Sequence, residues 1–281
     1  MILLTWNLNA RVKNINEQLD VISGHNADVL AFQEVTKGSK DKLKENLKSR
    51  GYEYVVDSFS LSREPDELTG KRKYGQLIAS KYKIKPQDPN SENGFEVPWK
   101  ERILSADIFT EKGKIELHTT HIPPGASNGW IKIEMLEGIF KKLNIKTNKL
   151  RILCGDFNTP QIELKDGTMF TFAQRLKISD NNIVNVNLRA SRGSSWDDGE
   201  RNVIEKLKYN DLEDVYRKIH GYSKQDYSWH VNHGNKIGRR FDHIFASAEL
   251  KPVKCFYDHE VRERGLSDHS AMVALFNNDP E

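Results

Sequence analysis

The chain has 281 residues, a length that one large α/β domain or two smaller domains can account for. Hydrophobic residues make up 37% and charged residues 30%, which supplies enough apolar material for a sizeable core and excludes a chain that is disordered as a whole. The net charge of +3 excludes a protein that coats DNA through general basicity, so any affinity for nucleic acid must be confined to one surface.

The N-terminal region predicts a strand, a helix and a second strand. Residues 2–6 are apolar, residues 15–22 carry apolar side chains at helical spacing, and residues 29–32 form another short apolar run. This pattern predicts the beginning of an α/β fold.

The rest of the chain continues in the same way, with helices predicted over 40–50 and 130–143 and strands over 76–80, 103–109, 115–120 and 151–157. A hairpin turn is predicted between the two strands around residues 111–114. Residues 166–198 are rich in Asn, Ser and Gly, and we predict a loop there that moves over a site. Since the sequence contains no repeat and no linker rich in Gly, Ser or Pro, we expect one domain over residues 1–281.

The two cysteines predict buried thiols and no disulfide framework, because Cys154 lies in an apolar run and Cys255 is the only other one. The N-terminus lacks the basic and apolar regions of a signal peptide, and no run approaches the ~18 apolar residues of a membrane span. We therefore expect a cytoplasmic protein that does not associate with membranes.

Short polar segments follow five apolar runs of the sequence, and a sixth polar segment precedes the last apolar run. A single Asp at a strand end is usually a cap or turn residue, but ligand sites in open α/β sheets lie beyond the strand ends. Several such segments together indicate one site. The segments are Trp6-Asn7-Leu8-Asn9, Gln33-Glu34, His118-Thr119-Thr120-His121, Gly155-Asp156-Phe157-Asn158, Phe241-Asp242-His243 and Leu266-Ser267-Asp268-His269-Ser270.

These residue types favour hydrolysis of phosphate esters with a hard divalent cation. Carboxylate and carboxamide oxygens suit Mg²⁺ or Mn²⁺, and no Cys/His cluster has zinc spacing. The sequence contains no phosphate-binding Gly-rich loop and no Gly-x-Ser-x-Gly turn, so neither nucleotide binding by such a loop nor a serine hydrolase is supported.

The order of these segments resembles the signature of the endonuclease/exonuclease/phosphatase superfamily, from residue 2 to about residue 276. The C-terminal third is most similar to the exonuclease III class of abasic-site endonucleases. The residues that carry this second resemblance are Glu200-Arg201, Ile204-Glu205-Lys206-Leu207, Asp211-Leu212-Glu213-Asp214-Val215-Tyr216-Arg217, Tyr227-Ser228-Trp229 and Gly238-Arg239-Arg240-Phe241-Asp242.

The resemblance implies a fold and a metal site. The fold is a four-layer α/β sandwich of two packed mixed β-sheets flanked by helices, as in deoxyribonuclease I. The site lies at the edge where strand ends converge. Glu34 would be the main ligand of Mg²⁺ or Mn²⁺, supported by Asn7, Asn9 and Asp268.

The resemblance also implies catalytic roles. Asp156 would accept a proton from the attacking water, and Asn158 would hold that water or a phosphate oxygen. His269, oriented by Asp242, would donate to the scissile phosphate, because a carboxylate behind an imidazole stabilises its protonated form.

Two positions depart from the exonuclease III pattern. His121 stands where that class has Tyr, as in deoxyribonuclease I and several phosphatase and RNA-nuclease branches; a general acid, a hydrogen-bond donor and a structural histidine remain open. Arg239 stands where some abasic-site enzymes have Trp. Trp229 and Phe241 could still form the apolar walls of a pocket for an extruded sugar, or be ordinary core aromatics.

Further substrate contacts are predicted on basic and polar segments. The run that ends in Lys73 and Tyr74 suits backbone phosphates, although a solvated basic turn is the alternative. Arg102 and Asn128 resemble family segments that flank the site.

We therefore predict a metal-dependent phosphodiester hydrolase. The expected activity is that of a DNA repair endonuclease or 3′ exonuclease acting on duplex DNA, without an obligate protein partner. The alternative is a phosphatase or another phosphodiesterase, acting on RNA or a small molecule, because a fold does not fix its substrate. A catalytically inactive binding module is a third hypothesis, which the complete set of catalytic residues disfavours.

Overall fold

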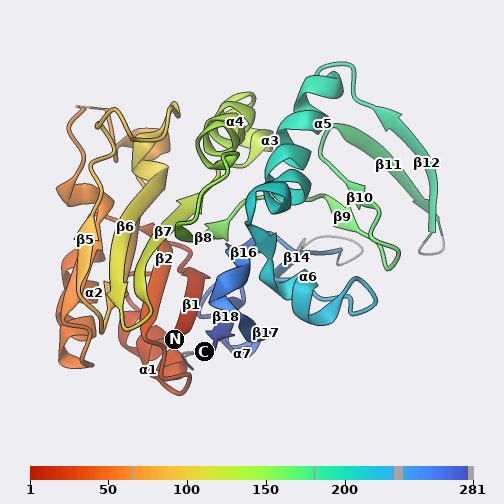
Figure 1. Cartoon of the computed structure of the whole chain (residues 1–281). Coiled ribbons are helices and arrows are strands. Elements are labelled where there is room, and N and C mark those ends of the chain that lie inside the picture. Colours follow the sequence, from red (N-terminus) through yellow and green to blue (C-terminus); the bar gives the residue numbers. More distant parts are fainter. Residues whose placement is uncertain (65, 180–181, 231–236, 278–281) are drawn as a thin grey trace.

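Two six-stranded mixed β-sheets packed face to face form the centre of the computed structural model, which describes residues 1–64, 66–179, 182–230 and 237–277 (Figure 1). Neighbouring strands of the first sheet run antiparallel, except for the parallel pair β1–β2. In spatial order the first sheet contains β17 (Pro252–Asp258), β18 (Ala271–Phe276), β1 (Ile2–Asn7), β2 (Val29–Val35), β4 (Gly75–Ser80) and β3 (Tyr54–Asp57).

The second sheet repeats this plan, with one parallel pair, β7–β8, among antiparallel neighbours. Its strands in spatial order are β13 (Glu213–Asp214), β16 (Asp242–Ala246), β8 (Leu150–Asp156), β7 (Gly113–His121), β6 (Ile103–Thr110) and β5 (Ile84–Pro86).

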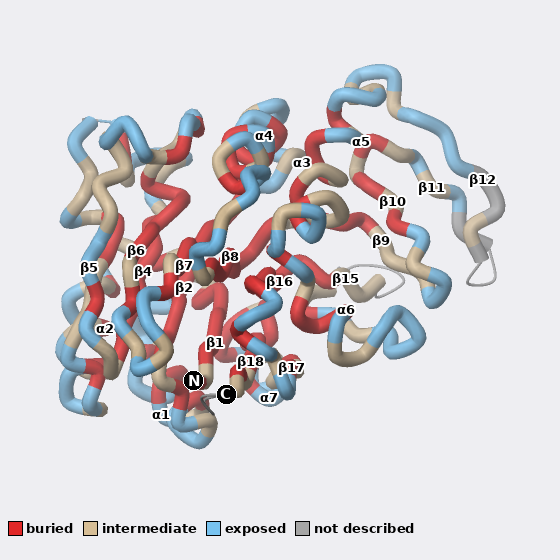
Figure 2. The backbone as a smooth tube through the Cα atoms, viewed as in Figure 1, coloured by how far each residue is buried: buried red, intermediate tan, exposed pale blue. Residues whose placement is uncertain are grey.

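Helices cover the outer face of each sheet, which gives four layers. Successive strand residues point to opposite faces, so Leu3 of β1 joins the core between the sheets and Leu4 joins the core under helices α1 (Ile15–Ser23) and α2 (Lys40–Ser49). Helices α4 (Ile131–Leu143) and α5 (Gly193–Arg201) cover the second sheet in the same way. Figure 2 shows burial concentrated along the strands of both sheets. The predicted four-layer α/β sandwich is confirmed.

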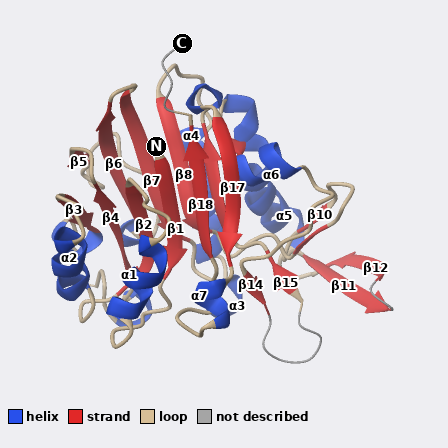
Figure 3. Ribbon diagram, turned by 90° about the horizontal axis from the view of Figure 1, so that it is seen from below, coloured by secondary structure: helices blue, strands red, loops and turns tan. Residues whose placement is uncertain are grey.

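Short elements connect the layers and surround one edge of the sheets (Figure 3). The remaining helices are α3 (Gly125–Asn128), α6 (Val215–His220) and α7 (Glu260–Glu263), with 3₁₀ turns at Ser58–Ser60, Gly70–Arg72, Lys100–Arg102, Leu207–Asn210 and Ala248–Leu250 and a π-helical turn at Asn202–Lys206. Three two-stranded ribbons pair β9 (Ile162–Glu163) with β10 (Met169–Phe170), β11 (Gln174–Ser179) with β12 (Asn182–Leu188), and β14 (Trp229–His230) with β15 (Gly238–Arg239).

The helices and strands predicted from periodicity are present within a few residues of the expected bounds. The predicted loop over 166–198 is wrong, because this segment contains β10, the β11–β12 ribbon and the first turns of α5. Its many Asn residues are poor strand formers, but cross-strand pairing compensates: Arg175 pairs with Asn187, and Leu176 pairs with Val186. The ribbon extends away from the two sheets in Figures 1 and 3.

Both cysteines are free and buried, as predicted, and burial raises the pKa of the Cys154 thiol to about 12. Within the described parts of the chain, no helix has the length and apolar character needed to cross a membrane.

Candidate active site

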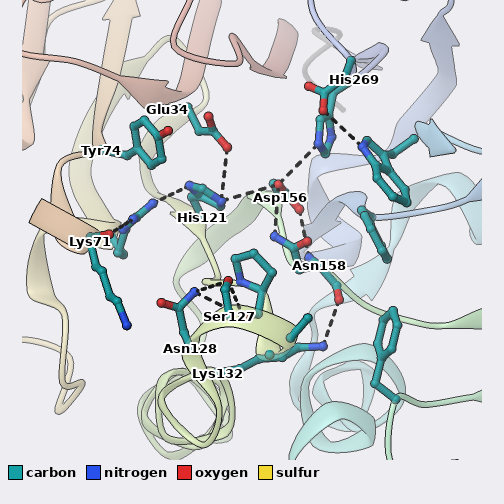
Figure 4. A pocket seen from close by; sticks show the side chains of 18 of the residues that line it. Glu34, Lys71, Tyr74, His121, Ser127, Asn128, Lys132, Asp156, Asn158 and His269 are labelled. Carbon is teal, nitrogen blue, oxygen red and sulfur yellow. Dashed lines mark hydrogen bonds and ion pairs between the residues drawn. The ribbon is translucent and has the colours of Figure 1, made fainter. Parts of the chain in front are cut away.

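A cavity of about 720 Å³ lies at one edge of the sandwich, where β2, β7 and β8 end and where β16 and β18 begin (Figure 4). The predicted catalytic, metal and substrate residues converge on it. All of them line the cavity except Asn7, Asn9 and Asp242: the lining members are Glu34, Lys73, Tyr74, Arg102, His121, Asn128, Asp156, Asn158, Trp229, Arg239, Phe241, Asp268 and His269.

A bulge at the end of β2 brings Glu34 to the cavity. The pairing of β2 with β4 shifts between Phe32 and Val35, and Glu34 has a φ of 53°, which a residue with a side chain rarely adopts. Next to it, the buried Gln33 amide donates to the hydroxyls of Thr5 and Thr119 and so joins the two sheets. The strained backbone at Glu34 is therefore held by surrounding structure, as is common at functional sites.

Asn7 links two of the carboxylates that line the cavity, those of Glu34 and Asp156. Its Nδ2 donates to Glu34 Oε1 at 3.2 Å and to Asp156 Oδ2 at 2.9 Å. Its Oδ1 accepts from the main-chain N–H of Asn9 at 2.9 Å, so the atom that would bind a metal is turned toward Asn9. In this structure Asn7 positions the carboxylates from behind the cavity, and direct metal ligation by Asn7 or Asn9 stays a prediction.

The turn after β8 fixes Asp156 and explains its flanking residues. Gly155 has a φ of 127°, and a Cβ there would lie 2.0 Å from the Thr120 carbonyl oxygen, so only glycine fits. The main-chain N–H of Asn158 donates to Asp156 Oδ1 at 2.9 Å. The Asn158 side chain donates to the Ile122 carbonyl oxygen at 2.9 Å, which holds its amide at the cavity wall.

His269 lies between two carboxylates. Its Nδ1 is 2.7 Å from Asp242 Oδ2, and its Nε2 is 3.7 Å from Asp156 Oδ2. Burial disfavours the charged ring, but Asp242 and Asp156 outweigh it and raise the pKa of His269 to about 10. Burial also raises the pKa of Asp156, an effect that Asp242 strengthens and His269 opposes. The ring is therefore a cation at neutral pH, with Nε2–H directed at the cavity.

His121 has the opposite protonation state. Its Nδ1 lies 2.6 Å from a guanidinium nitrogen of Arg102, which can only donate, so the ring proton sits on Nε2. Nε2 lies 3.6 Å from Glu34 Oε1 and 3.7 Å from Asp156 Oδ2 (Figure 4). Burial, Arg102 and His269 hold the pKa of His121 well below its usual value. His121 is thus a neutral N–H donor at the cavity wall.

Aromatic side chains form another wall. The Trp229 indole N–H donates to Asp268 Oδ2 at 3.2 Å, and its ring stacks on Phe241 at 5.3 Å between centroids and 22° between planes. Phe172 continues the row, 6.1 Å from Phe241, and the Arg239 guanidinium lies 4.8 Å from the Phe172 ring centre. Trp229 and Phe241 thus both line the cavity, and their contact with an extruded sugar stays a prediction.

The basic residues 71–73 before β4 point in two directions. Arg72 turns away from the cavity and pairs with Glu101 and Asp66. Lys73 lines the cavity together with the preceding Lys71. On the same side, Tyr74 lies 5.2 Å from the Arg102 guanidinium.

Several residues that line the cavity had no signal in the sequence, among them Phe172, Arg192 and Lys132. Phe172 and Arg192 lie in the segment predicted to be a loop, and Lys132 lies within a predicted helix whose other residues gave no hint of a site. Lys132 is buried, donates to Glu200 and to the Asn158 carbonyl oxygen, and packs on Phe172. Nothing short of the folded arrangement distinguishes these residues from ordinary core or surface ones.

The donor set fits a hard divalent cation at the carboxylates that face the cavity. Burial raises the pKa of Glu34, and the nearby negative charge of Asp268 adds to this effect, so a cation between them would relieve their repulsion. Ligand atoms of Asp156, Asp242 and His269 also lie within 4.8 Å of one another. That group is less suited, because the His269 Nδ1 is occupied by Asp242 and the ring is protonated.

A model of the endonuclease/exonuclease/phosphatase family matches residues 4–269. The chain belongs to this family. Its membership confirms the prediction of an enzyme that hydrolyses ester bonds. No curated protein sequence matches the chain closely enough to narrow the assignment within the family.

Solved structures of several nucleic-acid enzymes have the same fold as this family member. An AP endonuclease from Archaeoglobus fulgidus superposes with a TM-score of 0.68 at 21% identity, covering 99% of both chains. The 3′ phosphatase NExo from Neisseria bound to a product DNA hairpin has a TM-score of 0.64 at 18% identity, and a humanized TDP2 from D. rerio has 0.64 at 16% identity, each covering 99% of both chains.

Proposed function

We propose that this protein is a metal-dependent phosphodiesterase that cleaves DNA, as an endonuclease or 3′ exonuclease that acts in DNA repair. The observation that carries the proposal is the position of Asp156. Its carboxylate lies between the Nε2 atoms of His269 and His121, each at 3.7 Å, and accepts from Asn7, which also holds Glu34. A carboxylate that can act as a base, two imidazole N–H donors and a second carboxylate that can bind a metal therefore meet in one cavity.

Glu34 and Asp268 would hold Mg²⁺ or Mn²⁺ through their carboxylate oxygens. When bound, the cation would neutralise charge on the phosphate and polarise its oxygens. Asn7 would keep Glu34 and Asp156 apart and oriented, through the two hydrogen bonds that its amide donates.

Asp156 would accept the proton of the attacking water. Its pKa is raised by burial, which makes the carboxylate a better base than an exposed one. Asn158, fixed by the Ile122 carbonyl oxygen, would orient that water or a phosphate oxygen with its side chain.

His269 and His121 would stabilise the charge that develops on the phosphoryl oxygens. His269 does so as a cation whose Nδ1 proton is held by Asp242. His121 does so as a neutral donor, since Arg102 occupies its Nδ1. A role for His121 as a general acid that titrates near neutral pH is less compatible with its lowered pKa.

Several features support a nucleic-acid substrate. Lys71 and Lys73 can contact backbone phosphates, and the Trp229–Phe241 stack offers a flat apolar surface for a sugar or base. Proteins with the same fold have been solved with a DNA hairpin product and with a single-strand DNA product. Duplex DNA in the cytoplasm is the substrate and location we propose.

A phosphatase or a phosphodiesterase for RNA or small molecules is the second candidate. Arg239 favours it, because a guanidinium in the aromatic pocket suits an anionic substrate group better than an uncharged abasic sugar.

A panel of substrates tests the proposal. Purified protein with Mg²⁺ is assayed on abasic duplex, intact duplex, single-stranded DNA, RNA and a phosphomonoester, with Asp156→Asn as the inactive control. We expect cleavage of DNA that is abolished by EDTA. Faster turnover of the phosphomonoester than of any DNA would favour the second candidate, and full activity in EDTA would contradict the metal requirement.

A further inference from the structure

The aromatic wall of the cavity ends in Arg239, whose guanidinium forms no ion pair with any described residue. Arg239 stacks on Phe172 and lies 5.9 Å from the Phe241 ring centre. Its Nε is buried and makes no hydrogen bond, and no carboxylate of the described residues forms an ion pair with its guanidinium. Arg239 is half-buried, and burial lowers the pKa of its guanidinium, an effect that the charge of Glu200 opposes only in part. A cation held away from water is costly unless an anion accompanies it closely. An anionic group of a bound ligand could supply this counter-charge.

Arg192 places a second guanidinium on the same wall. One of its nitrogens donates to the Phe172 carbonyl oxygen at 2.6 Å, and its guanidinium carbon lies 4.2 Å from the Trp196 ring centre. Like Arg239, it lines the cavity and forms no ion pair with any residue whose position is described. Lys132 nearby differs, because Glu200 accepts from its Nζ at 2.7 Å and neutralises its charge.

The aromatic row separates these two arginines from the carboxylates of the cavity. The carboxylates of Glu34, Asp156 and Asp268 lie at one end, where the metal and the scissile phosphate would bind. The aromatic row begins at that end, since the Trp229 indole donates to Asp268, and it reaches the two arginines through Phe241 and Phe172. A sugar or base lying along this row would bring the next substituent of the nucleotide to Arg239.

We propose that Arg239, assisted by Arg192, binds a second phosphate of the substrate, one nucleoside away from the phosphate that is hydrolysed. The ligand class is a nucleotide unit that carries a phosphate on each side. The planar fork of arginine binds phosphate through two parallel hydrogen bonds, and stacking on Phe172 fixes the plane of the Arg239 fork. The second phosphate is either a terminal phosphomonoester or the next phosphodiester of the strand.

This inference rests on the proposed function and is tested on short DNA duplexes that differ only at their ends. The ends carry a hydroxyl, a 3′-phosphate or a 5′-phosphate, and kcat/KM is measured with Mg²⁺ for the bond nearest the end and for internal bonds. A phosphorylated end should be favoured by about tenfold or more, because a hydrogen-bonded charge pair contributes this much. Arg239→Gln should remove the preference, and Arg239→Lys and Arg192→Gln should reduce it.

Lys85→Gln provides the matched control, because it removes a positive charge from the exposed edge strand β5 and should leave the preference unchanged. A merely structural role for Arg239 would lower the melting temperature and affect all ends alike. The wild type could instead show no end preference, while Arg239→Gln raises the KM for internal bonds about tenfold. This result would identify the next phosphodiester of the strand as the group that Arg239 binds.

Two results are distinguished by the same assay. Wild-type cleavage that shows no end preference and is unaltered at every bond by Arg239→Gln and Arg192→Gln overturns the inference and leaves the proposed function intact. Absence of cleavage of every DNA in Mg²⁺ contradicts the proposed function itself.

Discussion

Asp242 and His269 form a buried pair in which Oδ2 of the carboxylate lies 2.7 Å from Nδ1 of the ring. Among the described residues, the second oxygen of Asp242, Oδ1, is buried and accepts no hydrogen bond, so His269 is the hydrogen-bond partner of this carboxylate there. This pairing fixes which nitrogen faces Asp156 and keeps the ring charged.

Asp242→Asn should lower kcat by roughly 10²-fold or more, because the amide no longer stabilises the imidazolium. The pKa of His269 should fall from its raised value toward that of a free histidine. NMR titration of the ring measures this shift directly, and an unchanged pKa together with a lowered melting temperature would show that the variant acts through stability instead.

Asp156→Asn should abolish proton transfer while keeping the shape of the site. We expect kcat to fall by about 10²-fold to 10⁴-fold with nearly unchanged affinity for DNA. Single-turnover kinetics and equilibrium binding separate the two quantities. Lost binding with preserved kcat would move the role of Asp156 from chemistry to substrate contact.

Glu34→Gln should weaken metal binding, since the variant loses the negative charge at the cavity. Isothermal titration with Mg²⁺ or Mn²⁺ should show a reduced affinity, and activity should recover in part at high metal concentration. Glu92→Gln is the control, because Glu92 is exposed and lies outside the cavity. Equal metal affinity in wild type and Glu34→Gln would exclude Glu34 as a main ligand.

His121→Gln should retain much more activity than His121→Phe, because the glutamine amide can still donate a hydrogen bond where the neutral ring does. Since the pKa of His121 lies well below its usual value, the wild-type rate should show no loss of activity through deprotonation of this residue between pH 6 and 8, a range around the usual value of about 6.5. The pH profiles of the three proteins provide the test. A basic limb near neutral pH that disappears in both variants would restore the general-acid role.

Glu163 should make stability depend on pH below the physiological range. Arg240 donates to both of its carboxylate oxygens, at 2.7 and 3.0 Å, and Arg217 adds a third bond at 2.7 Å. Burial opposes ionisation, but the two arginines outweigh it and lower the pKa of Glu163 to about 2. Because the folded pKa lies below the unfolded one, the stabilisation is complete above about pH 4.5 and is lost as the pH falls through about 2.

Glu163→Gln should therefore lower the free energy of unfolding at pH 7 by about 3 kcal/mol, since it removes the carboxylate paired with the buried Arg217 and leaves Arg240 with Asp214 as its acidic partner. Urea unfolding from pH 7 down to pH 3 should show the wild type losing more stability than the variant. If the unfolding free energies of wild type and Glu163→Gln fall in parallel over this pH range, the pKa of Glu163 is not lower in the folded state than in the unfolded state.

The local pattern of the sequence determined the α/β class and most elements, while the four-layer sandwich followed from the resemblance to a known family. Alternation and helical spacing depend only on neighbouring residues, so the strands around Leu3 and Ile152 and the helix around Leu136 could be predicted from spacing alone. The polar residues after these strands predicted the members of the site, because strand ends of one sandwich edge must converge. The composition of 166–198 misled the prediction, since pairing between strands overrides weak local propensity.

Only the tertiary structure decided which residues of the site are protonated. His121 is a neutral donor because Arg102, at the end of the 3₁₀ turn before β6, occupies its Nδ1, and His269 is a cation because two carboxylates distant in the sequence flank it. Phe172 belongs to the aromatic wall of the cavity only because the chain returns there after β10. Protonation and burial depend on distances between segments far apart in the sequence, and no local pattern contains those distances.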